Sequence, residues 1–444
     1  MTQPTDHKLR RSLGLFALIA YGVGDILGAG IYALVGKIAG IAGPASWLAF
    51  CVALLVAALT ALSYAELGRR FPRSGGESYF CQQAFRSPAF ALLIGWLVLC
   101  SGIVSLATVS RALAGYLLQL FTASPPASIE FATILLFLVV LGGINFWGIG
   151  QSSKANIVCT IVEASGLMLV IAVGIAFITR NVPAETATET IPAAWPAWTA
   201  IGQAAAVAFF AFIGFEDMVN VAEEVRSPKR NMPIAIIAAL LIAGTIYIAV
   251  VSVATAVVPA GELAASQAPL LAVVQRAAPA IPAWLFTAIA LFAVANTGLL
   301  NFIMASRLLY GMSQQGLVPG WLGQVHSKTQ TPHWSIAIVF LAAFALAVSG
   351  TLVYLAGTTS VLLLIVFLSV NIALVEIKRR SRGLRRGFRV PVVIPITAAA
   401  ASAVLIFFVP PQSLLSAAIV IALGILLVLT WRMRHKRLRI NSVK

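Results

Sequence analysis

Charged residues are scarce in this chain of 444 residues. Asp, Glu, Lys and Arg together make up 10% of the sequence, whereas soluble domains contain about 25%. Hydrophobic residues account for 60%, and the mean hydropathy is +0.97. This composition excludes an ordinary soluble domain. It predicts an all-α polytopic membrane protein, because apolar runs that cross lipid must satisfy their backbone groups within helices.

Cysteine and histidine are also few, with four of each. Three cysteines lie within apolar runs, no two form a C-x-x-C pair, and the histidines fall in tails or predicted loops. This spacing fits neither a disulfide framework nor a metal site. Nothing in the sequence resembles a nucleophile with its base. We therefore expect no catalytic residue, no metal and no cofactor, and a protein that is not an enzyme.

Long apolar runs fill most of the chain. About 20 apolar residues span a bilayer, and turn signals such as Gly43-Pro44 and Pro410-Pro411 separate the runs. This criterion predicts twelve transmembrane segments. They are residues 13–40, 44–67, 85–120, 129–148, 155–179, 199–224, 232–258, 283–312, 334–351, 355–377, 390–409 and 413–431.

Acidic residues are outnumbered, 14 against 30 basic residues, which gives a net charge of +16. With a cytoplasmic N-terminus, nearly all Lys and Arg fall in inner connections and tails, and outer connections keep little more than Arg180 and Arg276. This is the distribution that the positive-inside rule describes. We therefore expect a multi-pass protein of the cytoplasmic (plasma) membrane with both termini in the cytoplasm. The basic excess attracts anionic lipid, and we expect no nucleic-acid partner.

The first apolar segment contains an unusual stretch, Tyr21–Tyr32. Four glycines and one acid, Asp25, interrupt what should be a continuous apolar helix: Gly22, Gly24, Gly28 and Gly30. An opened helix exposes amides and carbonyls, which is tolerated only where the backbone faces protein or a water-filled cavity. The alternative is that these glycines let helices pack closely.

A second interruption follows five segments later, at Phe209–Asp217. Interrupted segments at matching positions of two halves indicate a transporter site near the middle of the membrane. Because five is odd, the second half would be inverted relative to the first. Glu216 lies within this stretch, and Asp217 beside it would point elsewhere on a regular helix.

Several motifs resemble those of amino acid permeases of the amino acid–polyamine–organocation (APC) superfamily. Gly28-Ala-Gly-Ile-Tyr32 is similar to the first-helix signature. Three further stretches match the family in the same chain order. Ala65–Glu77 resembles the first inner loop, and Phe210–Glu216, continuing to Pro233, resembles the sixth helix and the loop after it. Ser306–Met312 and Gly316–Pro319 together resemble the end of the eighth helix. The resemblance implies a leucine-transporter-like fold with twelve helices, a five-plus-five inverted repeat and two extra C-terminal helices, with helices one and six broken.

The resemblance also implies roles for residues at matching positions. Gly28, Ala29 and Gly30 match the segment that grips a substrate carboxylate through its amides. Phe210 matches an aromatic that closes over the substrate, and Gly214 matches the break in the sixth helix.

For three neighbouring residues, a structural role is an alternative to the functional one. Glu216 matches an acid linked to proton sensing or gating, and its alternative is a polar residue in a wet vestibule. Phe209 and Tyr21 flank the two breaks, where they would line the pocket or simply pack.

Two acids depart from the family pattern. Many proton-coupled relatives carry a lysine where the alignment through Asn156 and Thr160 places Glu163, and a small or apolar residue where Asp25 stands. Three interpretations compete: a proton carrier, a cation site with oxygens from Thr297 or Asn301, and a partner for a substrate ammonium. In the structural alternative, each acid bonds only local helix groups.

We therefore expect one transmembrane domain over residues 1–444 that carries amino acids or related amines. Its parts would be an N-terminal tail 1–12, repeats 13–179 and 199–378, two extra helices in 389–433 and a basic tail 434–444. Proton-coupled symport or exchange by alternating access is the leading interpretation, with Na⁺ coupling and an inorganic-ion carrier of the same fold as alternatives. Outside the class of transporters, the alternatives are a channel or a transport-inactive sensor. The expected partners are the small-molecule substrate and the lipid bilayer, and the sequence leaves the oligomeric state open.

Overall fold

The structure is a computed structural model that describes most of the chain. Four predicted features fall partly or wholly outside the described residues: the tail 1–12, positions 73–75 of the inner-loop motif, positions 316–317 of the eighth-helix motif, and the last residues, 442–444. The described residues are 13–72, 76–122, 125–147, 153–181, 195–314, 318–329, 331–380 and 387–441.

Helices account for nearly all of the regular structure in the described residues. The α-helices are α1 (Leu15–Ile26), α2 (Ala29–Ala42), α3 (Ser46–Arg70), α4 (Gly76–Phe85), α5 (Pro88–Leu118), α6 (Ala127–Trp147), α7 (Ser153–Asn181), α8 (Trp198–Ala208), α9 (Pro228–Val257), α10 (Ala260–Ala265), α11 (Pro269–Ala277), α12 (Ala283–Gln314), α13 (His333–Ser349), α14 (Leu352–Arg380), α15 (Val393–Ile406) and α16 (Pro411–Asn441). The short 3₁₀ helices are η1 (Gly43–Ala45), η3 (Phe209–Phe212), η4 (Asp217–Glu224) and η5 (Gly320–Gly323).

Most of the helices overlap the predicted apolar segments, whereas α4, α10 and α11 lie mainly or wholly in predicted connections. Nine helical stretches of the described chain are long and apolar enough to cross a membrane, and three shorter apolar helices, α1, α13 and α15, accompany them. The first predicted segment consists of α1 and α2 with a gap between them, and the sixth consists of α8 followed by η3 and η4. The chain is therefore an all-helical polytopic membrane protein in its described part, with interruptions where the glycines predict them.

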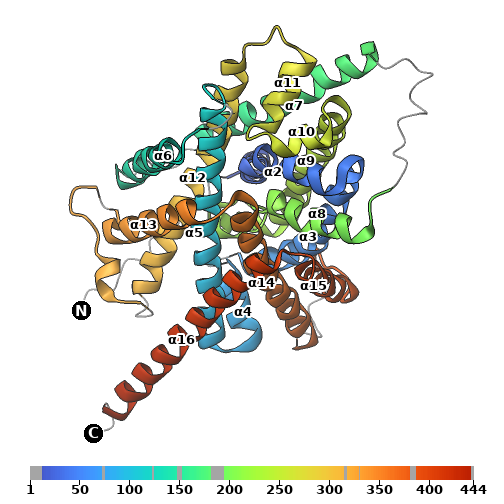
Figure 1. Cartoon of the computed structure of the whole chain (residues 1–444). Coiled ribbons are helices and arrows are strands. Elements are labelled where there is room, and N and C mark those ends of the chain that lie inside the picture. Colours follow the sequence, from blue (N-terminus) through green and yellow to red (C-terminus); the bar gives the residue numbers. More distant parts are fainter. Residues whose placement is uncertain are drawn as a thin grey trace.

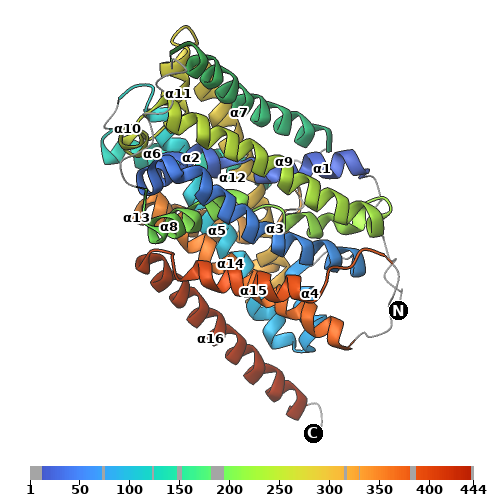
Figure 2. The same ribbon diagram turned by 90° about the vertical axis from the view of Figure 1, so that its right-hand side faces the viewer.

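The long helix α5 runs through the middle of the bundle (Figure 1). It packs against α12 and α14, while α3 packs against α9 and α1 packs against both α9 and α7. Figure 2 shows α16 at the edge of the bundle, where it contacts α5 and α14. This arrangement places the two interrupted regions inside the bundle.

The outward faces of the peripheral helices are apolar. Leu136 on α6, Ile161 on α7 and Leu415 on α16 have exposed fractions of 65%, 62% and 66%. A soluble protein rarely exposes such continuous apolar surface. These faces fit contact with lipid tails.

A buried charge cluster fixes one end of the bundle. Glu66 on α3 is fully buried and forms ion pairs with Arg70 and with Lys378 on α14, the latter at 2.7 Å. The same carboxylate accepts a hydrogen bond from the Val390 amide at 2.8 Å. The cluster thus joins α3, α14 and the chain that leads into α15.

Candidate functional site

The first interruption separates α1 from α2 and is held open by neighbouring helices. The amide of Ala29 donates a hydrogen bond to the Thr297 hydroxyl of α12 at 3.2 Å. The carbonyl of Ile26 accepts a hydrogen bond from the Tyr247 hydroxyl of α9. A side chain at Gly28 would place its Cβ 2.0 Å from the Thr297 Oγ1. The glycine therefore permits the close approach of α12 that supplies a partner for the freed amide.

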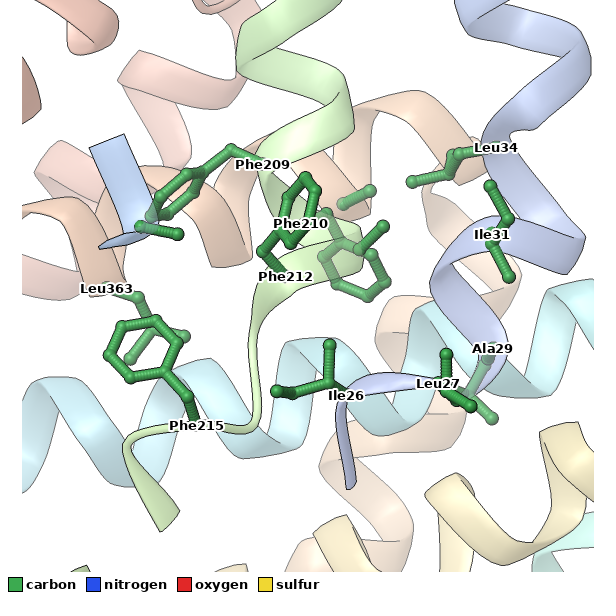
Figure 3. Packing of buried hydrophobic residues seen from close by; sticks show 14 of the residues in the cluster. Ile26, Leu27, Ala29, Ile31, Leu34, Phe209, Phe210, Phe212, Phe215 and Leu363 are labelled. Carbon is green, nitrogen blue, oxygen red and sulfur yellow. The ribbon is translucent and has the colours of Figure 1, made fainter. Parts of the chain in front are cut away.

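The second interruption lies directly against the first. The backbone becomes extended at Ile213 (ψ 138°) and Gly214 has φ +129°, a conformation that only glycine adopts without strain. A Cβ at Gly214 would lie 2.8 Å from the carbonyl carbon of Asp25. Figure 3 shows the non-helical backbone at Leu27 facing the extended backbone that leads to Phe215.

A small central cavity lies between the two interruptions. Its volume is about 30 Å³, which corresponds to about one water molecule. It brings together residues from both halves of the chain that the sequence singled out. These are Asp25, Gly28, Ala29, Gly30, Phe210, Gly214, Thr297 and Asn301, joined by Asp217 and Ser105 among others.

A larger cavity extends from the central one toward α4. This α4-side cavity measures about 560 Å³ and shares Asp25 and Asp217 with the central cavity. Tyr21, Glu77 and Arg307 also line it. Its volume is typical of a small-molecule site, so the interruption is open toward the α4 side.

A third cavity lies at the opposite end, near α10. This α10-side cavity measures about 430 Å³ and begins at Ala33, one helical turn beyond Gly30. Tyr32 and Tyr116 are fully buried nearby, with ring centroids 6.2 Å apart, and the Tyr116 hydroxyl donates to the Tyr32 carbonyl at 2.9 Å. No lining residue is common to this cavity and the central one in the described chain. The central and α10-side cavities are therefore separate in this structure.

One face of α5 borders all of these cavities. Gly95 and Val98 line the α4-side cavity, Ser105 lines the central cavity, and Ala112 and Gly115 line the α10-side cavity. Residues three, four or seven positions apart share a helix face. This face is made mainly of small side chains, which leaves room for a path along it.

Glu163 lies outside the three cavities and is held by α12. Its side chain is fully buried, and one carboxylate oxygen accepts a hydrogen bond from the Asn296 amide at 3.0 Å. The other oxygen is buried without a hydrogen-bond partner in the described chain. Its backbone carbonyl accepts from the Tyr32 hydroxyl at 3.1 Å.

Asp25 is placed differently from Glu163. It lines both the central and the α4-side cavity, and one of its carboxylate oxygens is buried without a partner among the described residues. An uncompensated buried carboxylate is costly. Of the two acids, Asp25 is therefore the one available to a molecule in the cavity.

The adjacent acids Glu216 and Asp217 also differ. Glu216 accepts a hydrogen bond from the Gly214 amide at 2.9 Å and borders a separate small space. Asp217 borders the same small space and, unlike Glu216, also lines the central and α4-side cavities. The expectation that Asp217 points elsewhere assumed a regular helix, whereas the backbone here passes through a turn into a 3₁₀ helix.

The remaining predicted residues have distinct surroundings. Phe210 lines the central cavity, whereas Phe209 is fully buried and packs edge-on against Phe367 with ring centroids 5.9 Å apart. Tyr21 lines the α4-side cavity but not the central cavity. Asn296 is a residue that sequence reasoning missed, although its position beside Thr297 within an apolar segment was a usable signal.

Taken together, fold and site define a polytopic membrane protein in which a small cavity between two interrupted helices continues into a larger cavity of small-molecule size. In the described chain, no cluster of three or more His, Cys, Asp or Glu is arranged to hold a metal ion. The sequence model of the family described as amino acid permease matches residues 13–431. The chain belongs to the amino acid permease family.

Curated relatives agree with this membership. The chain is 28% identical to the branched-chain amino acid permease of Bacillus subtilis (strain 168), covering 98% of this chain and 95% of the relative. It is also 28% identical to the methylthioribose transporter of the same organism, covering 98% and 96%. It is 32% identical to the human cationic amino acid transporter 4, over 76% of this chain and 55% of the relative. The family therefore points to transport across a membrane.

Proposed function

We propose that the protein is a secondary-active transporter that carries amino acids or related amines across the cytoplasmic membrane. The observation that carries this proposal is the convergence of two interrupted helices on one cavity that continues into a wider cavity on the α4 side. Such breaks are tolerated in membranes where they line a site. Transport would proceed by alternating access, with twelve crossings arranged as a five-plus-five inverted repeat and two further helices. The protein would act as one transmembrane domain.

The proposed orientation places both termini in the cytoplasm. The α4-side cavity then opens to the cytoplasm, and the α10-side cavity opens to the exterior. The basic residues at the end of α14, Lys378 to Arg380, lie on the cytoplasmic side in this orientation, as the positive-inside rule requires.

The two charged groups of an amino acid would bind where the central cavity meets the α4-side cavity, which has room for the rest of the solute. The amides of Gly28, which directly precedes α2, and of Ala29 and Gly30 lie at the positive end of the helix dipole and suit the carboxylate. The Ala29 amide would exchange its hydrogen bond to the Thr297 hydroxyl for one to the substrate. Asp25 faces the same cavity with one unpaired oxygen and suits the ammonium. A bound substrate would thereby neutralise the buried acid.

Glu163 would carry the coupling proton. Its charge is buried and its only side-chain hydrogen-bond partner in the described chain is the neutral Asn296. Because charge burial without a cation is costly, protonation of Glu163 would favour one arrangement of α7 and α12 over another. A proton gradient acts on transport through such a difference between states.

The test is flux through purified protein in liposomes. Leucine, lysine and methylthioribose represent the cargo named for the relatives, and a diamine such as putrescine represents the amines. We expect at least one of them to accumulate above equilibrium under an imposed proton gradient, and preloading with the same solute to accelerate uptake. Accumulation only under a sodium gradient would replace the proton with Na⁺. Saturable binding without flux or exchange would identify a sensor and contradict the proposal.

A further inference from the structure

The α10-side cavity is separate from the proposed substrate site and has a different charge. Lys37 and Arg111 line it and face one acid, Glu130. In the α4-side cavity the balance is reversed, with three acids and one cation, Arg307. A cavity of about 430 Å³ with excess positive charge suits a small anionic ligand.

The two cations are anchored so that donors remain for a ligand. Lys37 donates to the Ala264 carbonyl at 2.6 Å. Arg111 donates to the Ala347 carbonyl at 2.6 Å and pairs with Glu130 at 2.8 Å. An ammonium has three donors and a guanidinium has five. These contacts therefore fix both side chains without exhausting their donors.

Amide groups complement the two cations in the same wall. Gln119, directly after α5, and Gln267, between α10 and α11, also line the cavity. A carboxylate accepts hydrogen bonds at two oxygens, and Arg and Lys bind it through charge-assisted hydrogen bonds. The lining groups match a carboxylate better than a neutral solute.

The position of Lys37 relates this cavity to the central one. Gly30 lines the central cavity, and Ala33 and Lys37 line the α10-side cavity at successive turns of the same face of α2. Seven residues of helix correspond to about 10 Å. A carboxylate at Lys37 would thus lie on the same helix as the amides proposed to hold it in the central cavity.

We propose that the α10-side cavity is a second binding site, selective for the carboxylate of a small organic acid or amino acid, in which Lys37 and Arg111 are the ligand-binding residues. That this carboxylate belongs to the transported solute rests on the proposed function; the binding itself does not.

The test measures binding of propionate to the purified protein by saturation-transfer NMR, with propionamide as the uncharged isostere. We expect saturable binding of propionate and at least tenfold weaker binding of propionamide. Lys37→Gln should weaken propionate binding about tenfold, as loss of a charge-assisted hydrogen bond does, and Lys37→Arg should retain it. Arg276→Gln is the matched control, because Arg276 is exposed on α11, pairs with Glu262 and does not line the cavity.

A second variant keeps the test decisive if Lys37→Gln does not fold. Glu130→Gln removes the single acid of the cavity and releases Arg111, so it should tighten propionate binding several-fold. Unchanged or weaker binding in Glu130→Gln, full affinity in folded Lys37→Gln, or equal binding of propionate and propionamide would each overturn the proposal. None of these outcomes depends on measuring transport, so a failed flux assay would leave this result intact.

Discussion

Asn296 on α12 donates a hydrogen bond to the carboxylate of Glu163 on α7, at 3.0 Å and 133 residues apart in sequence. An amide donor satisfies one oxygen but does not balance the charge. The other oxygen is buried without a hydrogen-bond partner among the described residues. Protonation of Glu163 would therefore remove an unbalanced buried charge. The pair also links two long helices that border the interrupted region.

The first prediction concerns Glu163→Gln. Glutamine keeps an oxygen that accepts from Asn296 but cannot exchange a proton. We expect a folded protein whose proton-driven accumulation falls at least tenfold, while exchange of labelled for unlabelled solute across the membrane continues. Glu262→Gln, at an exposed acid on α10, is the control that should match wild type in both assays. If Glu163→Gln still accumulates solute at the wild-type level, another group carries the proton.

Asp25→Asn tests the proposed ammonium site. Loss of a charge-assisted contact typically costs about 1.5–3 kcal/mol, so the KM for an amine-bearing solute should rise about 10- to 100-fold. The maximal rate should change less, because the cavity shape is kept. Uptake in liposomes over a range of solute concentrations measures both constants. An unchanged KM would mean that Asp25 does not contact the solute.

Gly30→Ala should destabilise the protein. The added Cβ would lie 2.6 Å from the Cα of Ala211, which is backbone and cannot rotate away. Overpacking of this kind costs about 1–3 kcal/mol, so we expect a lower midpoint of thermal unfolding in detergent. Gly261→Ala is the matched control, because a Cβ there meets no atom within 4 Å. Equal midpoints for the two variants would show that α2 and η3 are not tightly packed.

Glu66→Gln should lower the folding stability more than Glu376→Gln, which removes a carboxylate that pairs with exposed arginines on α14. Glu66→Gln leaves Lys378, which is 8% exposed, without its carboxylate partner, and breaking a buried ion pair from one side costs about 3–5 kcal/mol. Glu376→Gln also removes an ion pair of α14, but Arg379 and Arg380 there are exposed at 74% and 41%, so the cost should stay below about 1 kcal/mol. Thermal unfolding of both variants measures the difference, and similar losses would argue against a structural role for the cluster.

The pH dependence of stability should report on Glu77, which lies on α4, outside the long membrane-crossing helices. Burial raises the pKa of Glu77 to about 7, although the Tyr64 hydroxyl donates to it at 3.2 Å. The folded state therefore binds a proton between about pH 4.5 and pH 7 where the unfolded state does not. Folding stability should rise as the pH falls through 7, and Glu77→Gln should remove that part of the dependence. A wild-type slope that persists in Glu77→Gln would assign it to another group.

The sequence predicted the position of both interruptions. Glycines and an acid inside an apolar segment conflict with a continuous helix, and that conflict is visible without coordinates. The structure has α1 ending at Ile26 and α2 beginning at Ala29, and α8 ending just before Phe209. Four glycines in the first segment, and the single Gly214 beside two acids in the sixth, were sufficient because they affect the backbone locally.

The roles of the neighbouring acids were less predictable. Whether Glu216 or Asp217 faces the cavity depends on the backbone rotation at Gly214, where φ is +129°. The partner of Glu163 depends on how α7 and α12 pack, which no local pattern records. Distances between segments far apart in sequence are a property of packing, and the sequence alone therefore left three interpretations of Asp25 and Glu163 open.

The continuous small-residue face of α5 has a consequence for how this protein can change its cargo. The groups proposed to recognise the charges of a solute in the central cavity, Asp25 and the first amides of α2, lie on other helices. On α5, the charged residue Arg111 lies in the α10-side cavity, and the face formed by Val98, Ser105 and Ala112 is uncharged. Enlarging or trimming one of these side chains would alter the size of solute that fits without touching either its charge recognition or its energy source. If the central cavity is the substrate site, the residues that limit the size of a solute there are separate from those proposed to recognise its charge, and a substitution could change one property without the other.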